Sequence, residues 1–302
     1  MNGAVKWIEH TLSQIVASDS KRSVENKHLT IKQLLGLLPY CITPDSESIE
    51  IPVAQNGEWK MATFNITIIP LLPSFFPSSD QFHAYGLTPK DKSLDCFLLY
   101  KGTTYPTDYG FWTTLVADLF PFSDIGKPIM WFGKKRIEDW LQNQPSGVHA
   151  IGQSLGGALA LMSHNLPNIL SVTGINSALP STSSACPNST IIRNNCDTIS
   201  KIGVIPKDTD AFQVSTIFKG IPAVLAHIQP WLADPNSMMH KLTPEEKQHN
   251  KYEAWWLLYW IVRPLAFCLL LPFYIIHLVC AYLKDLVLWL LQPVTHLFSS
   301  PP

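Results

Sequence analysis

The chain has 302 residues, which allows one substantial domain with additions or two modest domains. Its composition is 46% hydrophobic and only 15% charged, below the roughly one quarter charged that is usual for soluble domains, so part of the apolar content is expected to face a membrane. A formal net charge of -1 provides no positive surplus to hold a phosphate backbone, which argues against nucleic acid as a partner.

The six cysteines form no CxxC pair and no Cys/His cluster with the spacing of zinc ligands. We therefore expect no metal site and no cofactor. Cys186 and Cys196 lie close together in a polar stretch and are candidates for a disulfide, although nearness in sequence does not establish the required geometry. Residues 1–20 mix charged residues with short apolar runs, unlike a signal peptide, so export by that route is not expected.

Residues 1–60 are predicted to form a helical N-terminal extension. Apolar residues recur at helical spacing within the first forty positions, and Pro44 with the polar run 45–50 ends that pattern. Residues 61–70 are β-rich and partly alternating, and they begin a predicted catalytic domain that extends to residue 254. Residues 71–89 are crowded with proline, serine and aromatic residues and are predicted to be an irregular loop.

From residue 94 onward, short apolar runs alternate with helical stretches, as in α/β proteins. This pattern predicts an α/β fold with a mostly parallel central sheet. The predicted strands are 94–100, 147–152, 169–175 and 189–194, and the predicted helices are 132–142 and 155–165.

Residues 152–156 read Gly-Gln-Ser-Leu-Gly and match G-x-S-x-G, the pattern of a nucleophile elbow. In such an elbow a serine stands on a strained turn between a strand and a helix, and its hydroxyl projects from the sheet. The pentapeptide alone is weak, because roughly one chain in ten of this length would contain it by chance. Its context is specific, since a predicted strand ends at Gly152 and a predicted helix begins at Leu155. Ser154 is therefore the candidate nucleophile.

A serine hydroxyl needs a base, and the base needs an orienting group. In α/β-hydrolases the acid and then the histidine follow the serine in the chain. Asp197 comes just after a predicted strand, although Asp208 and Asp210 are alternatives. Among the later histidines, His277 and His296 lie in the apolar tail, and His227 falls in a predicted apolar helix, where a packed histidine is the ordinary interpretation. The spacing alone leaves His240 and His249 open.

Four segments resemble motifs of the class-three, fungal-type lipases, members of the α/β-hydrolase superfamily. GQSLGGALAL is similar to their GHSLGGALA segment, and LLYKGTT (98–104) to their oxyanion-strand motif. IIRNNCDTI resembles the strand that leads to the triad aspartate, and HNKYEAW (249–255) resembles the run that carries the catalytic histidine. The four motifs keep the family's order and cover about half of the chain.

The resemblance implies a triad of Ser154, Asp197 and His249, with Thr103 and the backbone N–H of Leu155 as the oxyanion hole. It also implies a mobile lid in the aromatic segment that follows Thr104, for which an ordinary helix packed on the core is the alternative. The chain departs from the family at three positions: Gln153 replaces histidine, Lys101 replaces arginine and Ala254 replaces tyrosine.

The C-terminal residues 255–302 are predicted to form a hydrophobic, membrane-associated segment. Residues 264–283 contain no Asp, Glu, Lys or Arg and are long enough to cross a bilayer as a helix. Pro272 and His277 interrupt the run. A second apolar stretch follows Lys284 and Asp285, which would allow a hairpin or an interfacial helix in place of a single span, and a helical layer of a soluble core is the competing interpretation. Lys247, Lys251 and Arg263 precede the run while only Lys284 follows it, which favours a catalytic domain on the cytoplasmic side.

Together these features predict a membrane-associated serine esterase or lipase that cleaves carboxylic esters of lipids through an acyl-enzyme intermediate. An inactive membrane-anchored scaffold with the hydrolase fold is the alternative from another class. A thioesterase or acyltransferase that uses the same serine is a further alternative.

Overall fold

The computed structural model describes most of the chain, and everything below concerns this part of it. The described residues are 3–17, 24–55, 58–74, 82–103, 111–121, 123–182, 184–197, 199–215, 227, 238–249 and 257–299.

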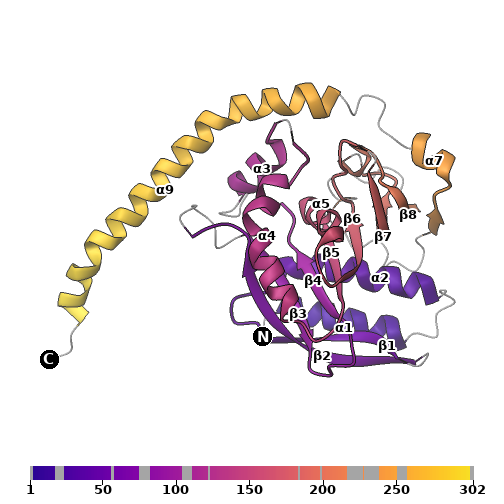
Figure 1. Cartoon of the computed structure of the whole chain (residues 1–302). Coiled ribbons are helices and arrows are strands. Elements are labelled where there is room, and N and C mark those ends of the chain that lie inside the picture. The colour runs from indigo at the N-terminus through magenta and orange to yellow at the C-terminus, as the bar shows by residue number, and fades with distance from the viewer. Residues whose placement is uncertain are drawn as a thin grey trace.

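The domain is built on one nine-stranded sheet in which the strands follow one another in chain order (Figure 1). Strands β4 to β8 run parallel, whereas β1 to β4 and the final pair β8–β9 are antiparallel. The strands are β1 (Ser48–Gln55), β2 (Glu58–Pro70), β3 (His83–Pro89), β4 (Cys96–Tyr100), β5 (Val148–Gln153), β6 (Ile169–Ile175), β7 (Ala185–Asn194), β8 (Lys207–Ser215) and β9 (Met238–Lys241).

The expectation of a mostly parallel sheet was wrong, because half of the neighbouring strand pairs described here are antiparallel. Parallel neighbours need long crossover connections, which are often helical. The chain supplies helical crossovers with α3 (Phe111–Leu119) and α4 (Lys127–Gln142) between β4 and β5, and with α5 (Leu155–Met162) between β5 and β6. Short connections join β1 to β2 and β3 to β4, so those strands reverse direction. The fold is an α/β fold with a mixed sheet.

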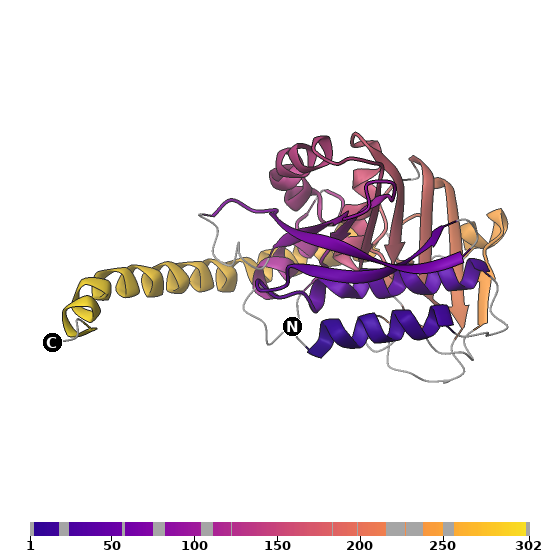
Figure 2. The same ribbon diagram turned by 90° about the horizontal axis from the view of Figure 1, so that it is seen from below.

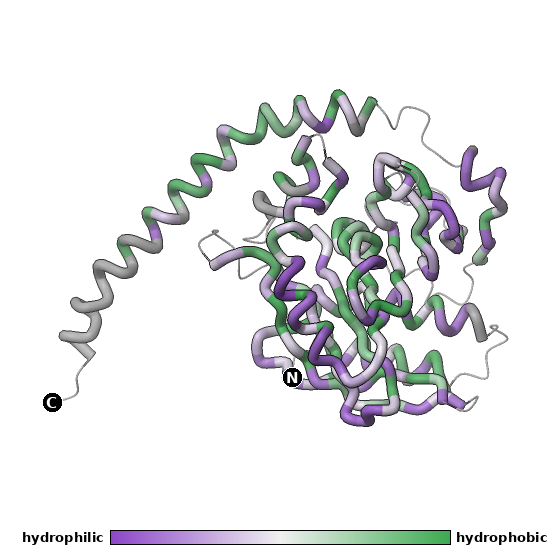
Figure 3. The backbone as a smooth tube through the Cα atoms, in the orientation of Figure 1, coloured by the Kyte–Doolittle hydropathy of each residue, from purple (hydrophilic) through white to green (hydrophobic). Residues whose placement is uncertain are grey.

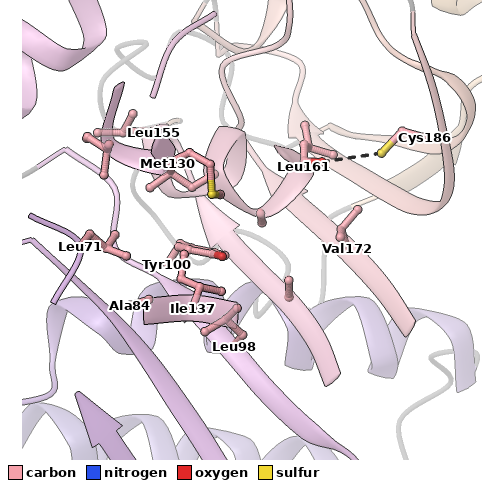
Figure 4. Packing of buried hydrophobic residues seen from close by; sticks show 14 of the residues in the cluster. Leu71, Ala84, Leu98, Tyr100, Met130, Ile137, Leu155, Leu161, Val172 and Cys186 are labelled. Carbon is pink, nitrogen blue, oxygen red and sulfur yellow. Dashed lines mark hydrogen bonds between the residues drawn. The ribbon is translucent and has the colours of Figure 1, made fainter. Parts of the chain in front are cut away.

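Helices cover both faces of the sheet and create two hydrophobic cores. On one face lie α1 (Gly3–Ala17) and α2 (Val24–Leu37), which Figure 2 shows as a layer beneath the strands. On the other face α5 packs against the parallel strands β4, β5 and β6, and α4 packs against β2 and β3 of the antiparallel part. Figure 4 shows this second core, in which Leu98, Tyr100 and Val172 of the sheet meet side chains of the two helices.

The two N-terminal helices are therefore part of the domain's packing. Ile8 and Leu12 of α1 and Leu34 of α2 are fully buried against the sheet. The expected helical extension 1–60 also contains β1 and the start of β2. The helical prediction agrees with the described residues 3–17 and 24–37, and the boundary of this region as a separate unit stays a prediction.

Residues 83–89, predicted to be part of an irregular loop, form β3. The loop was predicted from the proline, serine and aromatic residues of 71–89, and most of these precede the strand. The one glycine of β3 has a packing role. A Cβ on Gly86 would stand 2.2 Å from Cε2 of Trp140, so glycine lets α4 approach the strand closely. The edge strand β1 contains Pro52, which an edge tolerates because no neighbour needs its missing N–H.

The C-terminal segment forms one long helix, α9 (Arg263–Ser299), which leaves the domain and projects away from it (Figures 1 and 3). The helix is continuous through Pro272 and through Lys284 and Asp285, so the chain does not turn back there as a hairpin. The stretch from Trp260 to Lys284 has a mean hydropathy of 2.2 and is almost entirely unburied, and it is long and apolar enough to cross a membrane. A packed helical layer of a soluble core does not describe this helix.

Candidate active site

Ser154 stands at a sharp turn between β5 and α5. Strand β5 ends at Gln153 and α5 begins at Leu155, so the serine is the single residue between them. Its backbone has φ 58° and ψ -124°, a conformation that residues other than glycine rarely adopt. Its N–H donates to the carbonyl of Ile175 on β6 at 2.9 Å, which ties the turn to the sheet. The turn has the strand-to-helix form that the sequence pattern demands.

Two glycines make this turn possible because backbone atoms lie where their side chains would stand. A Cβ on Gly152 would lie 2.1 Å from the carbonyl oxygen of Gly156, inside the turn itself. A Cβ on Gly156 would lie 2.3 Å from the carbonyl oxygen of Tyr100, at the end of β4. The turn can therefore close, and α5 can pack against β4, only with glycine at both positions.

Asp197 is buried just beyond the end of β7 and is hydrogen-bonded to a histidine. Its side chain is fully buried, and its Oδ1 accepts the N–H of Ile199 at 3.0 Å. Its Oδ2 lies 3.0 Å from Nδ1 of His227, which is helical and 8% exposed. Because an ionised carboxylate can only accept, Nδ1 carries the proton in this bond and Nε2 is left free for proton transfer.

The other two candidate acids lie in different surroundings. Asp208 is exposed, with a positive φ of 59°. Asp210 is exposed and forms an ion pair with Lys241 at 2.8 Å. Asp197 is thus the candidate whose carboxylate meets a buried imidazole.

The histidine at Asp197 is His227, which sequence reasoning had set aside as a packed residue. His249, favoured by the family resemblance, is the last residue of α7 (Pro244–His249), and its side chain lies outside the described residues. His240 is exposed and pairs with Glu246 at 2.9 Å. Since the described Oδ2 contact of Asp197 is to His227, we replace His249 by His227 as the candidate base.

His227 lies beside the serine turn. The side-chain Nε2 of Gln153, the residue before Ser154, donates to the backbone carbonyl of His227 at 2.6 Å. The structure therefore brings the elbow, the buried acid and a histidine together, although they come from three separate parts of the chain.

Thr103 lies next to the same turn because Gly102 packs against it. A Cβ on Gly102 would be 3.2 Å from Cβ of Ser154 and 2.4 Å from the carbonyl oxygen of Gln153. The hydroxyl of Thr103 donates to Oδ2 of Asp118 at 2.7 Å. Asp118 belongs to α3, within the aromatic segment in which a lid was expected. Residues 105–110 and 122 of that segment lie outside the described part of the chain.

Burial raises the pKa of Asp118 to about 7, and the hydrogen bond from Thr103 and the electrostatic interactions with Arg263 and His227 oppose the shift. A second buried charge lies near Asp197. Burial lowers the pKa of Arg193 to about 10, and the carboxylate of Asp197 opposes this shift.

The cysteines and metal-ligand residues add no further centre. All six cysteines, each of them described, are free, so Cys186 and Cys196 form no disulfide. Within the described residues no group of three His, Cys, Asp or Glu side chains has the arrangement of a metal site.

A scan against protein-family models and a search of curated proteins found no match to this chain. Among solved structures, the chain is similar to a crystal structure of a triacylglycerol lipase from Penicillium expansum, with 13% identity and a TM-score of 0.38. The match covers 74% of this chain and 84% of that chain. A likeness this distant carries no argument about the site.

The raised pKa of Asp118 predicts a pH dependence of stability. The folded protein binds this proton more tightly than the unfolded chain, in which the pKa has its ordinary value of 3.8. The stability that the proton provides is therefore complete below about pH 4 and is lost as the pH rises through about 7. Asp118→Asn should remove this part of the decline when the Tm is measured from pH 4 to pH 8. Superimposable profiles for the two proteins would contradict the assignment.

Proposed function

We propose that the chain is a membrane-attached serine hydrolase of the α/β-hydrolase class that cleaves carboxylic esters of lipids through an acyl-enzyme intermediate. Ser154 is the nucleophile, His227 the general base and Asp197 the orienting acid. The observation that carries the proposal is the buried Asp197–His227 pair beside a serine at a strand-to-helix turn with positive φ. A structural serine would not require such a backbone conformation.

In the proposed reaction, Oγ of Ser154 attacks the ester carbonyl carbon while its proton passes to Nε2 of His227. The bond between the carbonyl carbon and the alcohol oxygen then breaks, and His227 gives the proton to the departing alcohol. Water attacks the acyl-serine in the same way, again with His227 as base, and releases the acid. Asp197 stays ionised throughout, because it holds Nδ1–H and stabilises the imidazolium that forms twice in the cycle.

The oxyanion formed in both steps would be bound by the N–H of Leu155 and by Thr103. Leu155 is the first residue of α5, so its N–H has no acceptor within the helix and lies at the positive end of the helix dipole. The hydroxyl of Thr103 points to Asp118 in this structure. It would have to rotate to donate to the oxyanion, and protonation of Asp118 would make that rotation easier.

Helix α9 supports a lipid substrate and membrane attachment. The exposed residues Leu269, Phe273 and Ile276 are typical of its surface, and water is an unfavourable partner for so many apolar side chains on one helix. A bilayer would cover them. The positive-inside tendency of the flanking lysines and arginine favours a catalytic domain on the cytoplasmic side.

The start of α9 is fixed close to the site, which suits a substrate that stays in the bilayer. The guanidinium of Arg263 donates to the carbonyls of Phe120 and Ser123, just beyond the end of α3. The rings of Phe120 and Phe267 meet edge to face, with centroids 5.7 Å apart. Helix α3 also carries Asp118, the partner of Thr103.

The proposal predicts that a serine-reactive fluorophosphonate labels the full-length protein in detergent, and that Ser154→Ala abolishes the labelling. His227→Ala should lower kcat for a p-nitrophenyl ester by about a thousand-fold or more, because the serine loses its base. His249→Ala and the exposed His240→Ala serve as matched controls and should keep kcat near the wild-type value.

A large loss of kcat in His249→Ala with normal kcat in His227→Ala would contradict the proposal and identify His249, which the family resemblance favours, as the base. A folded wild-type protein that hydrolyses no ester and takes up no label would instead support an inactive scaffold.

Membrane attachment through α9 predicts that carbonate or high salt leaves the intact protein in the membrane pellet and that detergent releases it. A chain truncated before Arg263 should move to the soluble fraction, because the apolar surface that the bilayer covers is lost. Release of the intact protein by carbonate without detergent would rule out a span.

A further inference from the structure

The backbone carbonyl of His227 is held by two buried side-chain amides. Nε2 of Gln153 donates to it at 2.6 Å and Nδ2 of Asn176 at 2.9 Å. Gln153 is 3% exposed and Asn176 is fully buried. Two buried donors on one carbonyl fix the position of the backbone at His227.

Asn176 connects this carbonyl to the strand that carries the acid. Its side-chain Oδ1 accepts the N–H of Asn194 at 2.9 Å, and its own N–H donates to the carbonyl of Ile192 at 2.8 Å. Both partners belong to the end of β7. The N–H of Asp197 then donates to the carbonyl of Asn194 at 3.1 Å.

These hydrogen bonds form a closed ring. From the His227 carbonyl it passes through Asn176 and Asn194 to Asp197, and it returns through the Asp197 carboxylate to Nδ1 of His227. Gln153 adds a direct link from His227 to the residue before Ser154. The ring of His227 is thereby held by the carboxylate of Asp197, and its backbone is held by the turn that carries Ser154.

Gln153 occupies the position at which the similar lipase motif has histidine, so the motif does not predict the hydrogen bond from its amide to His227. We propose that Gln153 and Asn176 are positioning residues that clamp the backbone of the base and so fix the reach of its imidazole toward Ser154. The inference rests on the proposed function. Its physical basis is that catalysis depends steeply on geometry: a misplacement of about 1 Å can cost about a hundred-fold in rate.

The clamp predicts that Gln153→Leu lowers kcat for p-nitrophenyl butyrate by about 10- to 100-fold with little change in KM, using the full-length protein in detergent micelles. Gln153→His should recover much of the loss, because an imidazole N–H can replace the amide donor at similar reach. Thr173→Val is the matched control, a buried polar residue on β6 whose hydroxyl has no hydrogen-bond partner among the described residues. It should leave kcat unchanged.

A spectroscopic signature tests the clamp independently of turnover. The proton between Nδ1 of His227 and the buried Asp197 carboxylate should give a far-downfield proton resonance that disappears in His227→Ala. Gln153→Leu should broaden or shift this resonance, whereas Gln153→His and Thr173→Val should retain it.

The outcomes separate the clamp from the proposed function. Normal kcat and an unchanged resonance in Gln153→Leu would overturn the clamp, as would a rise in KM with kcat unaltered. A resonance that depends on Gln153 in a wild-type protein without esterase activity would overturn the proposed function and leave the clamp standing. If the wild-type protein shows no resonance that depends on His227, the Asp197–His227 pair itself is wrong and both ideas fall.

Discussion

The site depends on one backbone constraint, the positive φ of Ser154 at the junction of β5 and α5. A non-glycine residue in such a conformation costs about 1–3 kcal/mol and persists only when the surrounding structure enforces it. The enforcement comes from packing: Leu155 and Leu159 are buried in the core beside the sheet, and the flanking glycines let the backbone close. Ser154 therefore keeps its strained conformation at the turn, because the strand before it and the helix after it cannot shift without disrupting the core.

The parallel part of the sheet then decides what can approach the serine. Strands β4, β5 and β7 run in the same direction, so their carboxyl ends meet at one edge. Thr103 follows β4, Ser154 follows β5 and Asp197 follows β7. Because each residue lies within three positions of the end of a strand, the sheet fixes its place. For His227, the hydrogen bonds to Gln153, Asn176 and Asp197 provide the positioning that the sheet gives to the other three residues.

Much of this could be predicted from the sequence wherever a residue's environment is local. The strands β5 and β6 are short, mostly apolar runs, and the G-x-S-x-G spacing fixes the turn between β5 and α5. The β3 strand was missed because the prolines, serines and aromatic residues of 71–82 dominate the composition of the predicted loop 71–89. The antiparallel part of the sheet was missed because β1 contains Pro52 and lies in a region predicted to be a helical extension, and because β9 has only four residues, most of them exposed.

The candidate base could not be chosen from the sequence, because a histidine in an apolar stretch looks the same whether it packs or pairs with an acid thirty residues away. The account is tested most directly by a crystal structure of the protein after reaction with a fluorophosphonate. It predicts phosphorus bonded to Oγ of Ser154, a phosphonyl oxygen at the N–H of Leu155 and beside Thr103, and Nε2 of His227 within hydrogen-bond distance of the adduct. Phosphorus on another residue, or a different histidine facing the adduct, would contradict it.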